Sequence, residues 1–162
     1  TLSHWALRLF DLGPGQYCGG AGGAGLGYGL GGSIGVALAN RDTDRLVIDL
    51  QSDGDAMATP QALWVAAHDR IPLLIVVDND RSFTNSVNHA ERVALARGRP
   101  VEAKTVGMLI DDPPVDFAAL ARSMGVHGEG PVTTVDELGP ALEAALKIVT
   151  GARRPALVDV LT

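Results

Sequence analysis

A chain of 162 residues fits one domain with one sizeable core, and 46% apolar but only 4% aromatic residues favour an α/β layered fold over an aromatic-rich β-sandwich. The formal net charge of −6 gives no electrostatic reason to expect nucleic acid or an anionic membrane surface as a partner, so an anionic ligand would be held by backbone N–H groups or a metal. The single Cys18 excludes an internal disulfide and favours a cytoplasmic location, and no stretch predicts a membrane span or a signal peptide.

Glycine dominates the first part of the chain. Residues 1–18 are expected to form an irregular lead-in with a turn at 13–15, and glycine then makes up most of 19–35. Apolar residues punctuate this glycine run, which leads into a helix-like stretch at 33–40. The pattern predicts backbone that lies close to another group rather than a flexible linker.

The centre of the chain predicts two strands around a helix. Residues 45–50 read as a buried strand, and the continuous apolar run at 73–78 is typical of a central parallel strand. Between them, Thr59 is expected to cap a helix that starts at Pro60 and ends near Arg70. A strand–helix–strand unit of this length places both strand ends side by side at one edge of the sheet.

The second half of the chain continues the alternation of helices and strands. Residues 79–106 are polar and basic without clean periodicity, and we expect a loop at the active site with a short helix near 89–97. Next come a helix at 117–123, capped by Asp116 and ended by Gly125, and a strand at 126–130. A capping box of Thr134 and Glu137 begins a helix to Val149, and a strand at 155–161 follows. The whole pattern predicts a single α/β domain over 1–162, a doubly wound parallel sheet with helices on both faces and ligands at the carboxyl ends of its strands.

Polar residues directly follow both central strands, at 52–55 and at 78–81. Asp53 and the side-chain oxygen of Asn79 would then face one crevice, and a loop carbonyl at Arg81 would supply a third oxygen. Mg²⁺ binds a few such oxygens and takes its remaining ligands from phosphate and water. The sequence therefore predicts a magnesium site at this edge of the sheet.

The backbone beside this metal site could bind an anion. Gly54 allows close approach, and the N–H groups of Gly54, Asp55 and Ala56 lie near a predicted helix start. Such N–H groups would offer donors to a diphosphate, which explains how an acidic chain could hold a polyanion without a lysine.

These residues resemble the thiamine-diphosphate motif, which is Gly-Asp-Gly, about two dozen residues, then Asn-Asn. The stretch 52–83 is similar to it, with 24 residues between Gly54 and Asn79. The glycine-rich 25–35 and the segments 112–125 and 155–160 are also similar to the diphosphate-binding C-terminal domain of acetolactate synthases and benzoylformate decarboxylases. The resemblance covers about 19–162 and implies an enzyme that decarboxylates 2-keto acids or makes or cleaves C–C bonds.

The resemblance implies thiamine diphosphate and Mg²⁺ as cofactors and gives each matching position a role. The metal ligands would be Asp53, Asn79 and the Arg81 carbonyl. The cofactor-binding residues would be Gly25, Gly54, Asp55, Ala56, Arg81 and Phe83. Leu26 would prop the cofactor into its bent shape, and the Ala24 carbonyl would accept a hydrogen bond from the cofactor's 4′-amino group. The bend serves a proton transfer within the cofactor, which prepares it to attack a carbonyl.

Three positions depart from the family pattern. Ser52 replaces the first glycine, which a negative φ would tolerate. Asp55 stands where serine commonly donates a hydroxyl to phosphate; a carboxylate cannot donate, so we expect it to turn away or to cap a helix. Asp78 replaces the first asparagine, and strand alternation should point it away from Asn79.

The family's catalytic glutamate sits in a separate pyrimidine-binding domain, and nothing in this sequence corresponds to that domain. We therefore expect the chain alone to be inactive, as a fragment or as the smaller subunit of a split enzyme. The implied partners are a pyrimidine-binding domain or subunit that carries the glutamate, a 2-keto acid or 2-hydroxyacyl substrate, and further copies in a homo- or hetero-oligomer.

Two other interpretations stay open from the residues alone. The run at 27–32 satisfies G-x-G-x-x-G and Asp49 ends the next strand, as in a Rossmann dinucleotide site, although no strand precedes the glycines. The chain could also be a non-catalytic structural domain of the same fold. His89 and the arginines of the 79–106 loop could form a solvated face or could contact substrate.

Overall fold

The computed structural model describes residues 2–19 and 25–162 and contains a parallel four-stranded sheet. Its strands are β1 (Ile48–Ser52), β2 (Leu74–Asn79), β3 (His127–Val132) and β4 (Ala156–Leu161). Their order across the sheet is β1-β2-β4-β3, and every neighbouring pair is parallel. The predicted doubly wound parallel sheet is confirmed.

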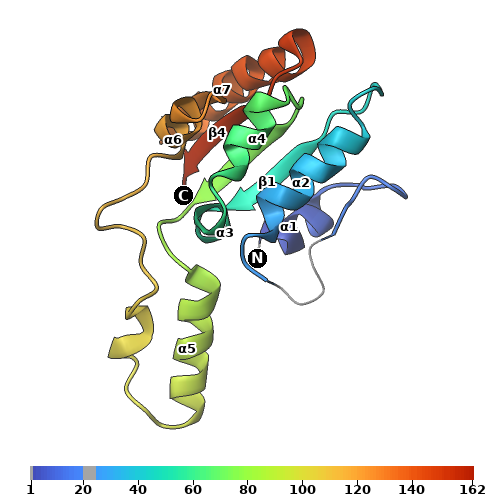
Figure 1. Ribbon diagram of the computed structural model, residues 1–162. Helices are drawn as coiled ribbons and strands as arrows, with labels where there is room; N and C mark the ends of the chain where they lie inside the picture. The colour runs from blue at the N-terminus through green and yellow to red at the C-terminus, as the bar shows by residue number, and fades with distance from the viewer. Residues whose placement is uncertain (1, 20–24) are drawn as a thin grey trace.

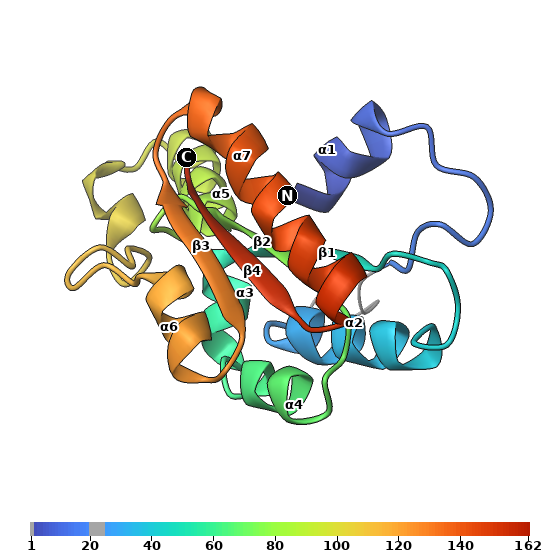
Figure 2. The same cartoon turned by 90° about the horizontal axis from the view of Figure 1, so that it is seen from above.

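Helices cover both faces of this sheet (Figure 1). They are α1 (Leu2–Leu9), α2 (Tyr28–Ala39), α3 (Asp53–Ala58), α4 (Ala62–His68), α5 (Thr84–Ala96), α6 (Phe117–Ser123) and α7 (Val135–Lys147), with a 3-10 turn η1 (Glu102–Thr105) and a π turn η2 (Ile148–Ala152). Figure 2 shows α2, α4 and α6 on one side of the sheet and α7 and α1 on the other. None of the helices in 2–19 and 25–162 combines the length and the hydropathy that a membrane crossing requires.

The central strand β2 is apolar from Leu74 to Val77 because both of its faces are buried there, and it ends in the polar residues Asp78 and Asn79. Ile75 and Val77 belong to the larger core under α2, α4 and α6, together with Phe117 of α6. Leu74 packs in the second core, under α7. Side chains of β2 therefore point into one core or the other, which explains the continuous apolar run in the sequence.

Local capping signals place the later helices where the sequence predicts them. Asp116 Oδ1 accepts a hydrogen bond from Ala119 N at 2.7 Å and so caps α6. The Thr134–Glu137 capping box begins α7. Gly125 follows α6 with a φ of 83°, which glycine adopts without strain.

Two expectations for the first part of the chain are wrong. Residues 2–9 form α1 rather than irregular backbone, because apolar residues recur at helical spacing and let Ala6 be buried. The helix expected at 33–40 begins earlier, at Tyr28, inside the glycine run. The turn near 13–15 is confirmed by the Gln16 N–H donating to the Gly13 carbonyl at 3.2 Å.

The segment after β1 also differs from the prediction. β1 itself begins and ends later than 45–50, so Ser52 is its last residue, and α3 follows at once. Thr59 does not cap α4, which begins at Ala62; its Oγ1 instead donates to the Gly27 carbonyl at 2.9 Å. A tertiary contact has therefore taken the hydroxyl that the sequence assigned to a local cap.

Between β2 and α6 the chain forms an arm, residues 83–108, that projects from the body (Figure 1). Its helix α5 spans 13 residues from Thr84, where only a short helix near 89–97 was expected. The arm is closed at its base by Phe83 N donating to Met108 O at 2.8 Å and Ile110 N donating to Arg81 O at 2.7 Å. No residue of α5 is buried.

Candidate functional site

The carboxyl ends of β1 and β2 lie side by side, as the sequence predicts. Ser52, the last residue of β1, pairs with Asp78 of β2. The residues that follow are in direct contact, since Ser82 N donates to Asp53 Oδ2 at 3.1 Å. Asp53 therefore meets the turn after Asn79 at one edge of the sheet.

Asp53 is a buried carboxylate with only 2% of its surface exposed. Its Oδ1 accepts from Gly54 N at 2.6 Å, and backbone N–H groups alone serve it, since in 2–19 and 25–162 no basic side chain forms an ion pair with it. Burial raises its pKa above the ordinary value, the Asp80 charge raises it further, and hydrogen bonds from Gly54 and Ser82 N–H oppose the rise. A buried acid without a cation is suited to a metal ion.

Asn79 is equally buried and is oriented by Asp159 of β4. Its Nδ2 donates to Asp159 Oδ1 at 2.9 Å and to the Val115 carbonyl at 3.3 Å. Because both amide hydrogens have acceptors, Oδ1 is the atom left for a ligand. Asp159 is fully buried and its Oδ2 accepts from Phe117 N at 2.9 Å, so the amide is anchored through β4 to α6.

Asp159 was missed by the sequence reasoning. Burial raises its pKa, and the hydrogen bonds from Asn79 and from the Phe117 N–H oppose that rise. The signal in the sequence is a single carboxylate inside the otherwise apolar β4. A charge at such a position requires a buried partner, and the partner here is the predicted metal ligand.

Arg81 stands at the rim of a cavity of about 170 Å³ at the carboxyl ends of β2 and β4. The cavity is lined by Asn79, Asp80, Arg81, Leu161 and Thr162. Arg81 has a φ of 57°, and its carbonyl already accepts the Ile110 N–H, so one lone pair remains for a metal. Within the described chain no three His, Cys, Asp or Glu side chains gather to hold a metal; the predicted ligand set contains one carboxylate, one amide and one carbonyl.

Gly54 is required by space rather than by its backbone angles. A Cβ there would lie 2.7 Å from Phe83 Cδ1, so the ring of Phe83 packs directly on this glycine. The Gly54 N–H, expected to reach a diphosphate, donates to Asp53 Oδ1 instead. Ala56 is buried in the core, which leaves only its backbone available to a ligand.

The departures from the family pattern have structural explanations. Ser52 has a φ of −84°, which a non-glycine residue adopts without strain. Asp78 accepts a hydrogen bond from Thr162 Oγ1 at 2.9 Å. Its neighbour Asn79 is buried while Asp78 is only half-buried, as alternation along a strand requires.

Asp55 caps a helix, though not its own. Its Oδ1 accepts from Gly27 N at 2.5 Å and its Oδ2 from Gly29 N at 3.1 Å, both at the start of α2. Leu26 is 64% exposed beside this cap. Gly25 is exposed as well, while the Ala24 carbonyl lies outside the described residues.

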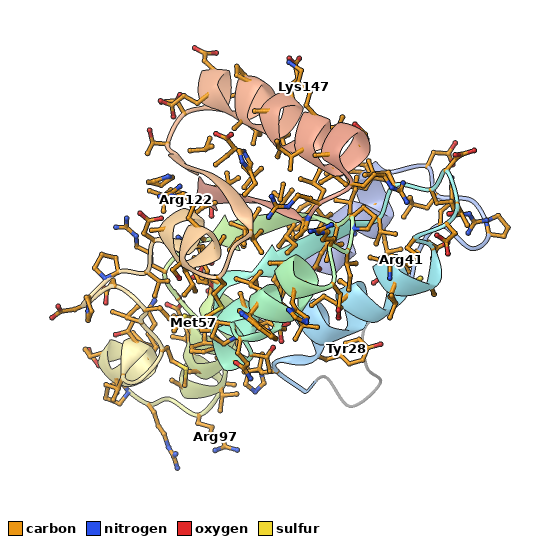
Figure 3. All side chains as sticks on the ribbon, turned by 45° about the horizontal axis from the view of Figure 1, so that its top comes forward. Tyr28, Arg41, Met57, Arg97, Arg122 and Lys147 are labelled. Carbon is orange, nitrogen blue, oxygen red and sulfur yellow. The ribbon has the colours of Figure 1, made fainter. Side chains whose placement is uncertain are left out.

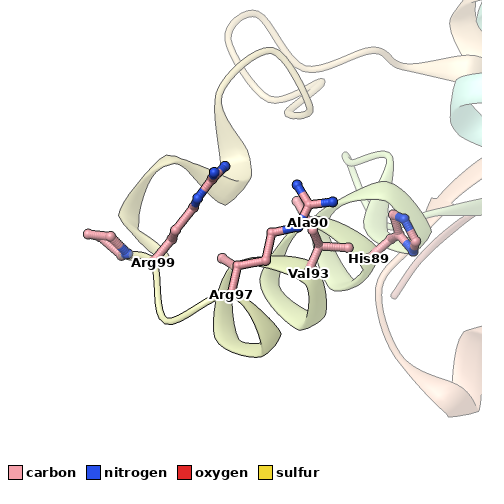
Figure 4. Close-up of a pocket in the computed structure, with 7 residues that line it drawn as sticks. His89, Ala90, Val93, Arg97 and Arg99 are labelled. Atoms are coloured by element: carbon pink, nitrogen blue, oxygen red, sulfur yellow. The ribbon is translucent and has the colours of Figure 1, made fainter.

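A larger cavity of about 350 Å³ lies on the arm (Figure 4). It is lined by His89, Ala90, Val93, Ala94, Arg97, Arg99 and Pro100. Figure 3 shows Arg97 at the outer end of the arm. The arm thus gathers basic side chains, but these line a separate cavity from the one at the strand ends.

A family match covers nearly the whole chain. Residues 1–160 match the family described as thiamine pyrophosphate enzyme, C-terminal TPP binding domain. The chain belongs to the thiamine pyrophosphate enzyme family. This assignment overturns the Rossmann alternative, and the structure agrees: Asp49, the acid which that alternative would place on a ribose, is only 7% exposed and faces Ser33 of α2.

Family members of known name are similar over most of this chain. A protein named as acetolactate synthase large subunit IlvX, from Mycobacterium tuberculosis, is 33% identical over 140 residues, which are 86% of this chain and 25% of that protein. Benzoylformate decarboxylase of Pseudomonas aeruginosa is 33% identical over 162 residues, 100% of this chain and 28% of that protein. The thiamine diphosphate-dependent 4-hydroxybenzoylformate decarboxylase of Rhodococcus jostii RHA1 is 31% identical with a TM-score of 0.64, over 85% of this chain and 23% of that one. The chain therefore spans about a quarter of the length of these relatives.

Proposed function

We propose that this chain binds thiamine diphosphate through Mg²⁺ and forms the diphosphate-anchoring half of an active site for 2-keto acids or 2-hydroxyacyl compounds. The observation that carries the proposal is the placement of two buried oxygen-bearing side chains, Asp53 and Asn79, at neighbouring strand ends. The family match supports the cofactor, and the ligand chemistry supports the metal.

The residues present fit both groups. Asp53 is buried without a cation, and the hydrogen bonds of Asn79 leave its Oδ1 available. The remaining lone pair of the Arg81 carbonyl would complete three protein oxygens, and phosphate and water would fill the other positions around Mg²⁺. Gly54 makes room for the ring of Phe83 beside the metal-ligand candidate Asp53, and the backbone of Asp55 and Ala56 next to it would be available to the diphosphate.

When bound, thiamine diphosphate supplies a carbon nucleophile and an electron sink for breaking the bond beside a ketone. This chain's residues hold and orient: Asp53 and Asn79 fix the diphosphate end, and Leu26 presents apolar surface to its middle. We propose decarboxylation of a 2-keto acid, with formation or cleavage of C–C bonds, as the reaction class, which suits relatives named acetolactate synthase and benzoylformate decarboxylase.

The complete active site would need a pyrimidine-binding domain or subunit that carries the catalytic glutamate. Two observations support this proposal. The chain spans about a quarter of its relatives, and Leu26 presents 64% of its surface rather than packing within the chain. We propose that assembly, as a homo- or hetero-oligomer, covers that exposed surface.

The proposal is tested by calorimetric titration of thiamine diphosphate with and without Mg²⁺. Wild-type chain should bind only when Mg²⁺ is present, and Asp53→Ala should abolish that binding because the metal loses its only carboxylate ligand. The matched control is Asp78→Asn, which changes a carboxylate at the same strand end that bonds to Thr162, and it should bind as the wild type does.

Unchanged affinity in Asp53→Ala would remove the metal assignment. Absence of binding by the wild type, also with a pyrimidine-binding partner present, would favour the non-catalytic structural alternative.

A further inference from the structure

The carboxylate of Asp55 joins two segments that are distant in the sequence. Its two oxygens accept the N–H groups of Gly27 at 2.5 Å and Gly29 at 3.1 Å, and Gln51 Nε2 donates to it as well. Gly27 is the residue directly after Leu26. Asp55 is the second residue after the metal-ligand candidate Asp53, on the same short helix.

Both backbone polar groups of Gly27 form hydrogen bonds with side chains of the segment 55–59. Its N–H donates to Asp55, and its carbonyl accepts from Thr59 Oγ1 at 2.9 Å. Its φ of 87° leaves glycine as the fitting residue, and a Cβ would lie 2.9 Å from Thr59 Cγ2. The position of Gly27 is therefore set by the stretch 55–59 rather than by its own neighbours in the chain.

Gly29 also lets the start of α2 lie close to the Asp55 carboxylate. A Cβ at Gly29 would collide with Gln51 Oε1 and with Asp55 Oδ2. The carboxylate thus occupies the space that a side chain would take, and it does so with a charge-assisted hydrogen bond at each oxygen. A serine at 55 would present a single uncharged oxygen on a shorter side chain, in place of the two carboxylate oxygens that each accept one of these N–H groups.

We propose that Asp55 is a positioning residue that fixes Leu26 relative to Asp53, and so sets the spacing between the apolar prop and the diphosphate anchor. The inference rests on the proposed function. It assigns to the side chain of Asp55 a role that differs from donating a hydrogen bond to phosphate, which a carboxylate cannot do. A ligand that spans both ends depends on this spacing, and a ligand that uses only the metal end does not.

Two ligands separate these cases: thiamine diphosphate, which reaches both ends, and inorganic pyrophosphate, which reaches only the anchor. The readout is the ratio of their affinities in calorimetry with Mg²⁺. In Asp55→Asn an N–H₂ group replaces one acceptor, so the preference for thiamine diphosphate should fall at least about tenfold. In Gly29→Ala the added methyl group should displace the Asp55 carboxylate, so the preference for thiamine diphosphate should fall by a similar factor.

The matched control is Glu137→Ala, which removes a capping carboxylate from α7 on the opposite face of the sheet. It should lower stability without changing the affinity ratio. This comparison separates positioning from a general loss of helix capping.

A second measurement needs no ligand. Amide hydrogen exchange by NMR should show Gly27 and Gly29 protected in the wild type and exchanging at least about tenfold faster in Asp55→Asn. Protected amides of β2 and β4 in the same spectra report that the variant is folded.

Equal protection of Gly27 and Gly29 in Asp55→Asn overturns the proposal. So does faster exchange with an unchanged affinity ratio, because the hydrogen bonds would then exist without positioning the ligand. A wild-type chain that binds neither ligand overturns the proposed function and this inference with it, whereas an unchanged ratio in a chain that binds both overturns this inference alone.

Discussion

The strand-end site and the arm place charged groups in opposite ways. Asp53 and Asp159 are buried, and each has defined hydrogen-bond partners. The arm, residues 83–108, carries four Lys or Arg and two Glu residues, and no position of its helix α5 is buried. The carboxylates at the strand ends therefore have fixed positions. The charged side chains of the arm are exposed, and only the base of the arm is joined to the body by backbone hydrogen bonds.

At the strand ends, the same buried side chains contribute to folding stability and to the geometry of the proposed ligand site. On the arm these two properties are separate. Changing a buried carboxylate removes packing and hydrogen bonds together, and under the proposed function Asp53→Ala would also remove a metal ligand. Changing an exposed charged residue of the arm alters the surface and contacts such as the Lys104–Glu91 ion pair, without touching the buried core.

Asp159→Ala should cause the largest loss, because it leaves the Phe117 N–H and one of the two Asn79 amide hydrogens buried without an acceptor. We expect about 3 kcal/mol less free energy of unfolding, measured by urea denaturation. Freed from Asp159, Asn79 should also bind Mg²⁺ less well. A loss below about 1 kcal/mol would mean that these groups find other partners and that the cluster is not a rigid anchor.

Gly54→Ala should cost about 1–3 kcal/mol, because the added methyl group meets the ring of Phe83. Thermal unfolding measures the effect. The control is Gly139→Ala in α7, where no described atom lies within 4 Å of a built Cβ, and that change should stabilise the helix. Equal effects of the two substitutions would contradict tight packing at the site.

Asp49→Asn should stabilise the protein, and only at higher pH. Burial raises the pKa of Asp49 from 3.8 to about 6, and the nearby Asp55 charge adds to this rise, while a hydrogen bond from Ser33 opposes it. Oδ2 of Asp49 has no hydrogen-bond partner in the described chain. Since folding favours the protonated acid, the stability contributed by Asp49 is full below pH 3.8 and is lost as pH rises through about 6.

The asparagine variant should therefore gain about 1–2 kcal/mol at pH 8 and nothing near pH 4, as measured by urea unfolding at both pH values. An equal gain at both values would refute a buried ionisation at this position.

Lys104→Ala should have the smallest effect. The Lys104–Glu91 ion pair, at 2.9 Å, joins η1 to α5 on the exposed arm. Such pairs contribute little in water, so the free energy of unfolding should fall by less than about 0.5 kcal/mol in thermal unfolding. A loss near that of Asp159→Ala would erase the contrast between the two regions.

The sequence predicted the central strands β2 and β4 because burial on both faces leaves a clear apolar pattern. The run at 73–78 became β2, and the caps at Asp116 and Thr134 began α6 and α7 as expected. It also predicted that the two strand ends meet, since parallel neighbours end at the same edge.

Other features depend on partners that are distant in the sequence. Thr59 looked like a local cap, but Gly27 takes its hydroxyl. The glycine run concealed the start of α2, because glycine has low helix propensity and the carboxylate of Asp55 supplies the cap from elsewhere. Asp159 lies in the segment 155–160 that resembles the family, but its role became visible only through its contact with Asn79.

The central claim is that Asp53 and Asn79 hold one divalent ion at the strand ends. Its most direct test replaces Mg²⁺ by paramagnetic Mn²⁺ in the presence of thiamine diphosphate and follows NMR line broadening. We expect selective broadening of the Asn79 side-chain amide and the Gly54 backbone amide, with arm signals such as Leu95 unaffected. Sharp Asn79 and Gly54 signals at saturating Mn²⁺, or broadening centred on the arm, would contradict it.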